Sequence, residues 1–218
     1  DGVPLYVEEL MKMLLASTLL REEAVQYVLT GPLRTVAIPD TLQDALMARL
    51  DQLQTAKEVA QRGAVLGREF AYELLQAIAP QDENALQAGL AQLVEAELLY
   101  QRGRPPRARY MFKHALIQDA AYASLLKSTR QQIHQQIAQV LEARFPALVE
   151  TQPELVAHHY TAASGYEQAV HYWQRAGQQA SDRSAHLEAI SHFTTGIELL
   201  QSLPETPART QHAVTLHI

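Results

Sequence analysis

The chain has 218 residues, of which 47% are hydrophobic, and a formal net charge of −6. These values are typical of a globule with one large or two small cores, and they exclude a disordered tail, a membrane protein and a generally basic nucleic-acid binder. The absence of cysteine excludes disulfides, zinc–thiolate sites and a cysteine nucleophile, and it predicts a cytoplasmic location. Helix-forming residues predominate, whereas Gly and Pro number only 9 and 10, so we predict a mainly α protein.

Residues 1–37 are predicted to form an amphipathic helix that begins near Pro4, followed by a loop that has room for a short extended pair. The most apolar stretch, 10–20, is too short to span a bilayer, and acidic residues precede it where a signal peptide would be basic. The chain begins without a methionine and stops at Ile218 within a helical pattern, so we expect it to be a piece of a longer protein.

Residues 38–145 are predicted to form a domain whose first half is helical. Asp40 is the expected N-cap of its first helix, in which apolar residues recur at helical spacing. Gly67 and Pro80 then separate three shorter helices, because both residue types interrupt helices. These three helices are predicted at 56–66, 71–78 and 82–97.

The second half of this domain is predicted to contain a β-hairpin and two helices. Extended runs at 98–102 and 108–113 are joined by a short turn-forming sequence, GRPPR. Three helices followed by a hairpin is the element order of a winged-helix domain, in which the hairpin is the wing. At His114 the apolar spacing changes from that of a strand to that of a helix, and another helix follows at 129–144, which Pro146 is expected to end.

His114 is the candidate functional residue at this joint between strand and helix. The first-turn amides of a helix lack partners and attract negative charge, so a titratable side chain there suggests a nearby anion such as phosphate. The alternative is an ordinary, partly buried histidine that is hydrogen-bonded to the backbone.

The hairpin carries a basic patch on an otherwise acidic chain. It could be a DNA-reading wing, a solvated hairpin or a contact to another domain. The predicted helix at 82–97, which would have to touch DNA, contains carboxylates and no Lys or Arg, which argues against DNA. The possible wing residues are Arg102, Arg104, Arg107 and Arg109.

Residues 152–218 are predicted to begin an array of tetratricopeptide repeats. Small and aromatic residues follow Trp173 at the offsets of this repeat, whose period is about 34 residues. The small residues let two antiparallel helices pack closely, and stacking on neighbouring repeats implies a continuation beyond Ile218. The repeat-packing residues are Trp173, Ala176, Gly177, Ala180, Ala189, Phe193 and Gly196.

Short catalytic motifs are missing from the chain. It contains no phosphate loop of the form GxxxxGK[ST], and no GxGxxG, GxSxG or HExxH. We therefore predict no catalytic residue and no enzyme activity for this fragment. The histidines of 152–218 repeat no spacing suited to metal ligands, so no metal site is predicted.

Several segments resemble the STAND class of signalling ATPases, which are relatives of the apoptotic and plant-immunity NB-ARC switches. Gly2-Val3-Pro4-Leu5 resembles the GxP motif that closes the nucleotide-binding core, and FKHALIQDAAY from Phe112 resembles the segment with the sensor histidine of the winged helix. IPDTLQDALMARLDQL and AKEVAQRGAVLGREF resemble the bacterial subgroup linked to class III adenylate or guanylate cyclases. The predicted winged helix and repeats also follow in the order of this family.

The resemblance implies a partial nucleotide site made of Gly2, Pro4 and His114. Pro4 would pack on adenine, and His114 would reach the β-phosphate of ADP in a closed state. The best-known relatives have Met-His-Asp where this chain has Lys113-His114-Ala115, so the acidic residue after the histidine is missing. ATP or ADP with Mg²⁺ is the implied cofactor of the full-length protein, and no tight nucleotide binding is expected of this fragment.

The same resemblance implies a regulatory switch that couples nucleotide state to an output domain such as a nucleotide cyclase. Residues 1–37 would be the end of the ATPase lid region and a linker. The implied partners are the upstream nucleotide-binding domain of the same chain and a protein or peptide on the repeats, with neither DNA nor membrane expected. Two alternatives are a DNA-binding winged-helix regulator with a repeat sensor and a plain repeat scaffold that binds peptides.

Overall fold

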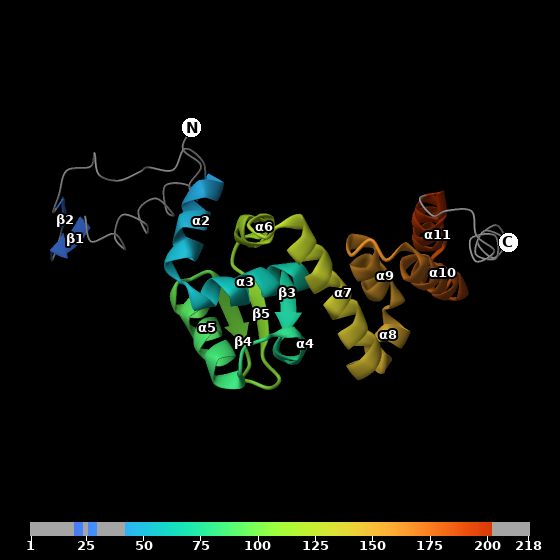
Figure 1. The fold of residues 1–218 in the computed structure, drawn as a ribbon, viewed down its shortest axis with the longest axis horizontal. Helices are drawn as coiled ribbons and strands as arrows, with labels where there is room; N and C mark the ends of the chain where they lie inside the picture. Colours follow the sequence, from blue (N-terminus) through green and yellow to red (C-terminus); the bar gives the residue numbers. More distant parts are fainter. Residues whose placement is uncertain (1–19, 24–25, 30–41, 202–218) are drawn as a thin grey trace. The chain divides into compact units, whose positions relative to one another are not determined.

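The computed structural model describes residues 20–23, 26–29 and 42–201 (Figure 1). Most of these residues are helical, and a small three-stranded antiparallel sheet accompanies the helices, so the predicted mainly α class is confirmed. The predicted first helix and the N-cap Asp40 lie outside the described residues. The expected extended pair is present as β1 (Leu20–Glu23) and β2 (Gln26–Leu29), which pair antiparallel.

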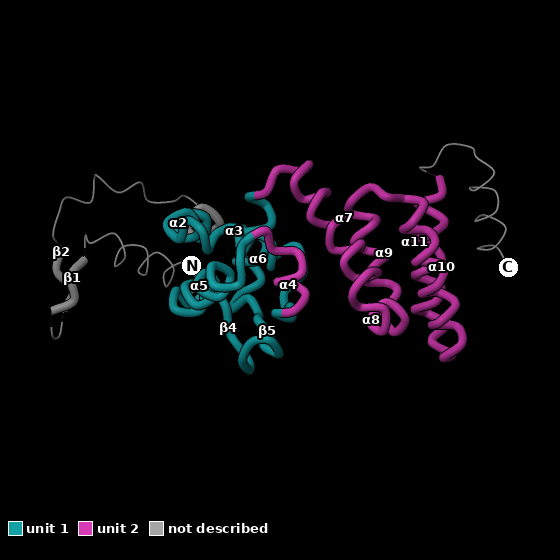
Figure 2. The backbone as a smooth tube through the Cα atoms, turned by 60° about the horizontal axis from the view of Figure 1, so that its bottom comes forward, with its two compact units in different colours: residues 1–72, 81–124 teal, residues 73–80, 125–218 magenta. Residues whose placement is uncertain are grey.

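The chain divides into two compact units (Figure 2). Unit 1 comprises residues 1–72 and 81–124, and unit 2 comprises 73–80 and 125–218. Unit 2 therefore begins its main segment at Leu125, within the range 38–145 that the sequence predicted as one domain. The reason is that the long helix of that range packs on the helix that begins at Pro153. No described helix combines the length and apolarity that a membrane span requires.

Apart from β1 and β2, the described part of unit 1 consists of helices and one three-stranded sheet. Its helices are α2 (Leu42–Gln52), α3 (Thr55–Leu66), α5 (Glu83–Glu95) and α6 (Ala115–Ala123). The strands of this sheet are β3 (Glu69–Ala71), β4 (Leu99–Arg102) and β5 (Arg109–Phe112). The predicted hairpin is confirmed as the antiparallel pair β4–β5, whereas β3, which pairs with the other side of β5, was not predicted.

Local sequence explains where these helices begin and end. The Asp82 carboxylate accepts a hydrogen bond from the Ala85 backbone N–H at 2.9 Å and so caps the start of α5. Gly67 ends α3 with φ +131°, a value that favours glycine because side chains clash there. The sequence prediction placed α3 and α5 within two residues of these bounds.

The core of unit 1 lies between the helices and one face of the sheet. Alternation along β5 buries Tyr110 and Phe112 and exposes Arg109 and Met111. The Phe70 ring of β3 lies 5.9 Å from each of these two buried rings, measured between centroids. Helix α3 packs against α5 and α6, which completes the layer over this face.

Unit 2 is a series of helices, and from residue 127 onward each helix packs on the next one along the chain. They are residues 73–78 of α4 (Tyr72–Ile78), α7 (Lys127–Arg144), α8 (Pro146–Thr151), α9 (Pro153–Ala162), α10 (Tyr166–Asp182) and α11 (His186–Gln201). The end of α7 at Arg144 was predicted. The short helix α8 was not predicted. Pro146 was expected only to end α7, but it also occupies the first turn of this new helix.

Candidate functional site

His114 lies between the last residue of β5 and the first of α6. Its backbone is extended, with φ −132° and ψ 144°, and it is the N-cap residue of α6. The residues on either side of this joint are anchored, because the side chains of Phe112 and Ile117 are fully buried. The Phe112 N–H donates to the Arg68 carbonyl at 2.9 Å, and the Lys113 N–H donates to the Leu98 carbonyl at 3.1 Å. The sheet therefore holds the backbone of His114 in a fixed place.

The His114 side chain is partly buried and caps no backbone amide of α6. The first turn of α6 contains no acidic residue, and its Leu116 is 44% exposed. An imidazole N–H beside open helix amides can donate to an anion such as phosphate. Of the three predicted nucleotide contacts only His114 is placed, since Gly2 and Pro4 lie outside the described residues.

Lys113, which precedes the candidate sensor, is directed toward the sheet. Its Nζ lies 3.6 Å from the Glu97 Oε2 atom and 5.8 Å from the centroid of the Tyr100 ring. The charge of Lys113 is thus already paired, and His114 is the polar side chain that remains at the joint.

The basic hairpin presents its arginines to solvent. Arg102, Arg104 and Arg107 are exposed, and none of the three makes an ion pair with the described residues. Arg109 differs, because its Nε lies 2.6 Å from the Glu69 Oε1 atom. Among the residues that the structure describes, the predicted wing therefore comprises one paired cation and three that lack a carboxylate partner.

The predicted repeat residues come together where α10 packs against α11. A Cβ atom on Gly177 would lie 2.4 Å from the Phe193 Cε1 atom, so only glycine allows this approach. The other small residues predicted on the two helices are also buried: Ala176, Ala180, Ala189 and Gly196. Trp173 donates from Nε1 to the Thr161 hydroxyl at 3.0 Å and stacks on His192, with the ring centroids 5.3 Å apart.

Two polar clusters in unit 2 were not predicted. The Nδ1 atoms of His134 and His159 are 2.8 Å apart, and burial lowers the pKa of both rings. One feature of the sequence could have indicated that His134 is buried, because it lies on the apolar stripe of α7 beside Ile133 and Ile137. Within the described residues, no three His, Cys, Asp or Glu side chains are arranged to hold a metal ion.

The second cluster is a carboxylate between two tyrosines. The Tyr160 hydroxyl donates to Glu142 Oε2 at 2.6 Å, and the Tyr172 hydroxyl donates to Glu142 Oε1 at 2.7 Å. The two rings stack with their centroids 6.1 Å apart. Burial, together with these hydrogen bonds, raises the pKa of both hydroxyls, that of Tyr172 to about 12. The cluster links α7, α9 and α10, and no local spacing in the sequence reveals it.

The comparisons with known proteins give one similarity. No family model matches the chain, and no solved structure matches it. An uncharacterized protein of Rhizobium meliloti is 29% identical over 210 residues, which are 94% of this chain and 20% of that protein. The chain thus spans about a fifth of the length of the relative that it matches.

Proposed function

We propose that the chain is a regulatory switch and protein-interaction fragment of a STAND-class ATPase, which couples bound ADP or ATP to an output domain such as a nucleotide cyclase. The observation that carries the proposal is the position of His114 at the joint of β5 and α6. Its side chain is partly buried and makes no capping hydrogen bond to α6. A sensor must contact its ligand in one state and release it in another, and an anchored backbone with an available side chain suits that task.

The order of elements in the first part of the chain supports a winged-helix assignment. Helices α3, α4 and α5 precede the hairpin β4–β5, and β3 adds a third strand to it. This is the arrangement in which the resemblance assigns a sensor role to the histidine after the hairpin. The helix pair α10–α11, with Gly177 packed on Phe193, supports tetratricopeptide repeats as the surface that receives a protein or peptide partner.

In the proposed resting state, His114 donates a hydrogen bond to the β-phosphate of ADP, while Pro4 packs on the adenine. The upstream nucleotide-binding domain would supply the phosphate loop and the Mg²⁺ ion. Since Ala115 replaces the acidic residue of the better-known relatives, the residue after His114 cannot supply a carboxylate to orient the imidazole. Release of this contact on exchange for ATP, or on binding of a partner to the repeats, would change the activity of the output domain.

The test is His114→Ala in the full-length protein, with co-purified ADP and basal output as the two measurements. We expect less retained ADP and a higher basal output, because the closed state loses a contact that the open state never had. His186→Ala is the matched control, since His186 is an exposed histidine at the start of α11. Unchanged ADP and unchanged output in the His114 variant would reject the sensor role.

A further inference from the structure

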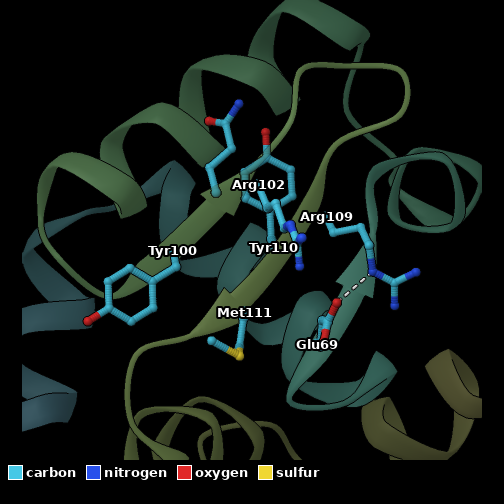
Figure 3. A pocket seen from close by; sticks show the side chains of 7 residues that line it. Glu69, Tyr100, Arg102, Arg109, Tyr110 and Met111 are labelled. Atoms are coloured by element: carbon cyan, nitrogen blue, oxygen red, sulfur yellow. Dashed lines mark hydrogen bonds and ion pairs between the residues drawn. The ribbon is translucent and has the colours of Figure 1, made fainter.

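The outer face of the three-stranded sheet exposes an apolar patch. The strand register places Glu69, Met111 and Tyr100 in one row across β3, β5 and β4 (Figure 3). Because side chains alternate along a strand, this row lies on the face opposite the core. Tyr100 is 51% exposed and Met111 36%, and the two contribute to the lining of a depression of about 230 Å³. An exposed apolar patch in a concave setting is typical of an interaction site.

Basic side chains border this patch. Residues 98–113 contain five of the chain's 18 Lys and Arg and none of its 24 Asp and Glu. Glu69 compensates Arg109, as the dashed line in Figure 3 marks, and Glu97 compensates Lys113. Arg102, which lines the depression, keeps its charge unpaired within the described residues, as do Arg104 and Arg107 in the adjoining loop.

We propose that this face binds an acidic polypeptide segment that places an apolar side chain on Tyr100 and Met111 and its carboxylates on Arg102, Arg104 and Arg107. Charge complementarity selects the acidic segment, since no described carboxylate makes an ion pair with these three arginines. The apolar surface of Tyr100 and Met111 selects an apolar side chain of the peptide, because contact with apolar atoms is what makes removal of this surface from water favourable. The proposal does not depend on the nucleotide-sensing role of His114.

A nucleic acid fits the same face less well. One aromatic ring is available, and Lys113 lies over it at 5.8 Å, which limits base stacking. The net charge of −6 also opposes a long polyanion, whereas a short acidic peptide meets only the local basic surface.

The test is a selection of short random peptides displayed on phage against the full 218-residue chain, followed by fluorescence anisotropy with the most enriched peptide. We expect the enriched peptides to be rich in Asp and Glu and to share an apolar residue. Binding should weaken by about tenfold or more in the double variant Arg102→Glu, Arg104→Glu, and also in Tyr100→Ser. Added salt should weaken it as well.

Arg144→Glu is the control for charge reversal, because Arg144 is an exposed arginine of α7 in the other unit. Arg107→Glu, in the loop of the hairpin, tests the charge without altering strand β4, should the double variant fail to fold. Three outcomes would each overturn the proposal: selection that enriches no acidic peptides, binding that the Arg107 variant leaves unchanged, and tighter binding of a short single-stranded DNA than of the best peptide.

Discussion

The Nδ1 atoms of His134 on α7 and His159 on α9 are 2.8 Å apart, and the two residues are only 2% and 1% exposed. At this distance one ring donates its N–H to the lone pair of the other, so the contact requires that the accepting Nδ1 atom carry no proton. Protonation of either ring would place a charge in a buried site, and protonation of the accepting Nδ1 atom would also bring two N–H groups against each other. His158 and Arg130 face the pair and oppose such a charge further.

This pair predicts that unit 2 loses stability in mild acid. The pKa of each buried histidine is lowered from 6.5, mainly by burial, so the unfolded chain takes up protons at a higher pH than the folded chain does. Stability should therefore be complete above about pH 7 and fall as the pH drops below 6.5, by at most about 1.4 kcal/mol per pH unit for each histidine. Urea unfolding followed through the fluorescence of Trp173, the chain's single tryptophan, measures this in unit 2.

His159→Gln should flatten this pH dependence, because the neutral amide has no proton to gain. His186→Gln is its control, since His186 is exposed and outside the pair. The idea fails if the slope of stability against pH is the same in the His159 variant as in the wild type.

Gly177→Ala should destabilise unit 2. The added methyl would lie 2.4 Å from the Phe193 Cε1 atom and 2.6 Å from Cδ1, which forces the two helices or the ring to move. Overpacking of this kind costs roughly 1–3 kcal/mol, while the higher helix propensity of alanine returns about 1 kcal/mol. We expect a net loss of up to about 2 kcal/mol in urea unfolding.

The double variant Gly177→Ala, Phe193→Ala tests the cause of that loss. With the ring removed, the new methyl has space, so the two losses should be less than additive. Gln178→Ala, an exposed change on the same helix, should be nearly neutral. Fully additive losses would show that the Phe193 ring is not the obstacle.

The Gly177–Phe193 contact also shows what the sequence alone can predict. Its two residues are 16 positions apart, which is their spacing in the tetratricopeptide repeat. The sequence of one helix pair is therefore enough to predict the contact. The hairpin was predictable for the same reason, since its two strands and the turn between them are adjacent in the chain.

Structure that depends on distant residues was not predictable in this way. Strand β3 has three residues and is a strand only because it pairs with β5, which follows about forty residues later. His134 and His159 meet because α7 packs on α9, and no spacing rule links one to the other. The predicted nucleotide contacts of Gly2 and Pro4 cannot be set beside His114, because both residues lie outside the described ranges.

Glu142→Gln should loosen the link between α7, α9 and α10. The carboxylate accepts one hydroxyl on each oxygen, whereas glutamine has one acceptor oxygen and must turn its NH₂ toward the second tyrosine. The loss of one charge-assisted hydrogen bond costs about 1–2 kcal/mol. Urea unfolding, with the exposed Glu150→Gln as control, measures the difference.

The same variant should lower the pKa of Tyr160 and Tyr172. Burial raises both values, and the hydrogen bonds to Glu142 and its negative charge raise them further. Removing the charge leaves burial as the main cause, so in an ultraviolet titration these two tyrosines should ionise at lower pH than in the wild type. Identical tyrosine titration curves for the two proteins would contradict the assigned role of Glu142.

Gly63→Ala should destabilise unit 1, which contains His114. A methyl group on Gly63 of α3 would lie 2.7 Å from the Phe70 Cζ atom, and Phe70 is only 2% exposed within the core. The ring cannot withdraw easily, since it stacks on Tyr110 with 5.9 Å between the centroids. We expect a net loss of about 1 kcal/mol by far-ultraviolet circular dichroism in urea, after the gain in helix propensity. Phe70→Leu should itself be destabilising, yet it should reduce the effect of Gly63→Ala, because the shorter side chain leaves room for the methyl; equal effects in both backgrounds would locate the strain elsewhere.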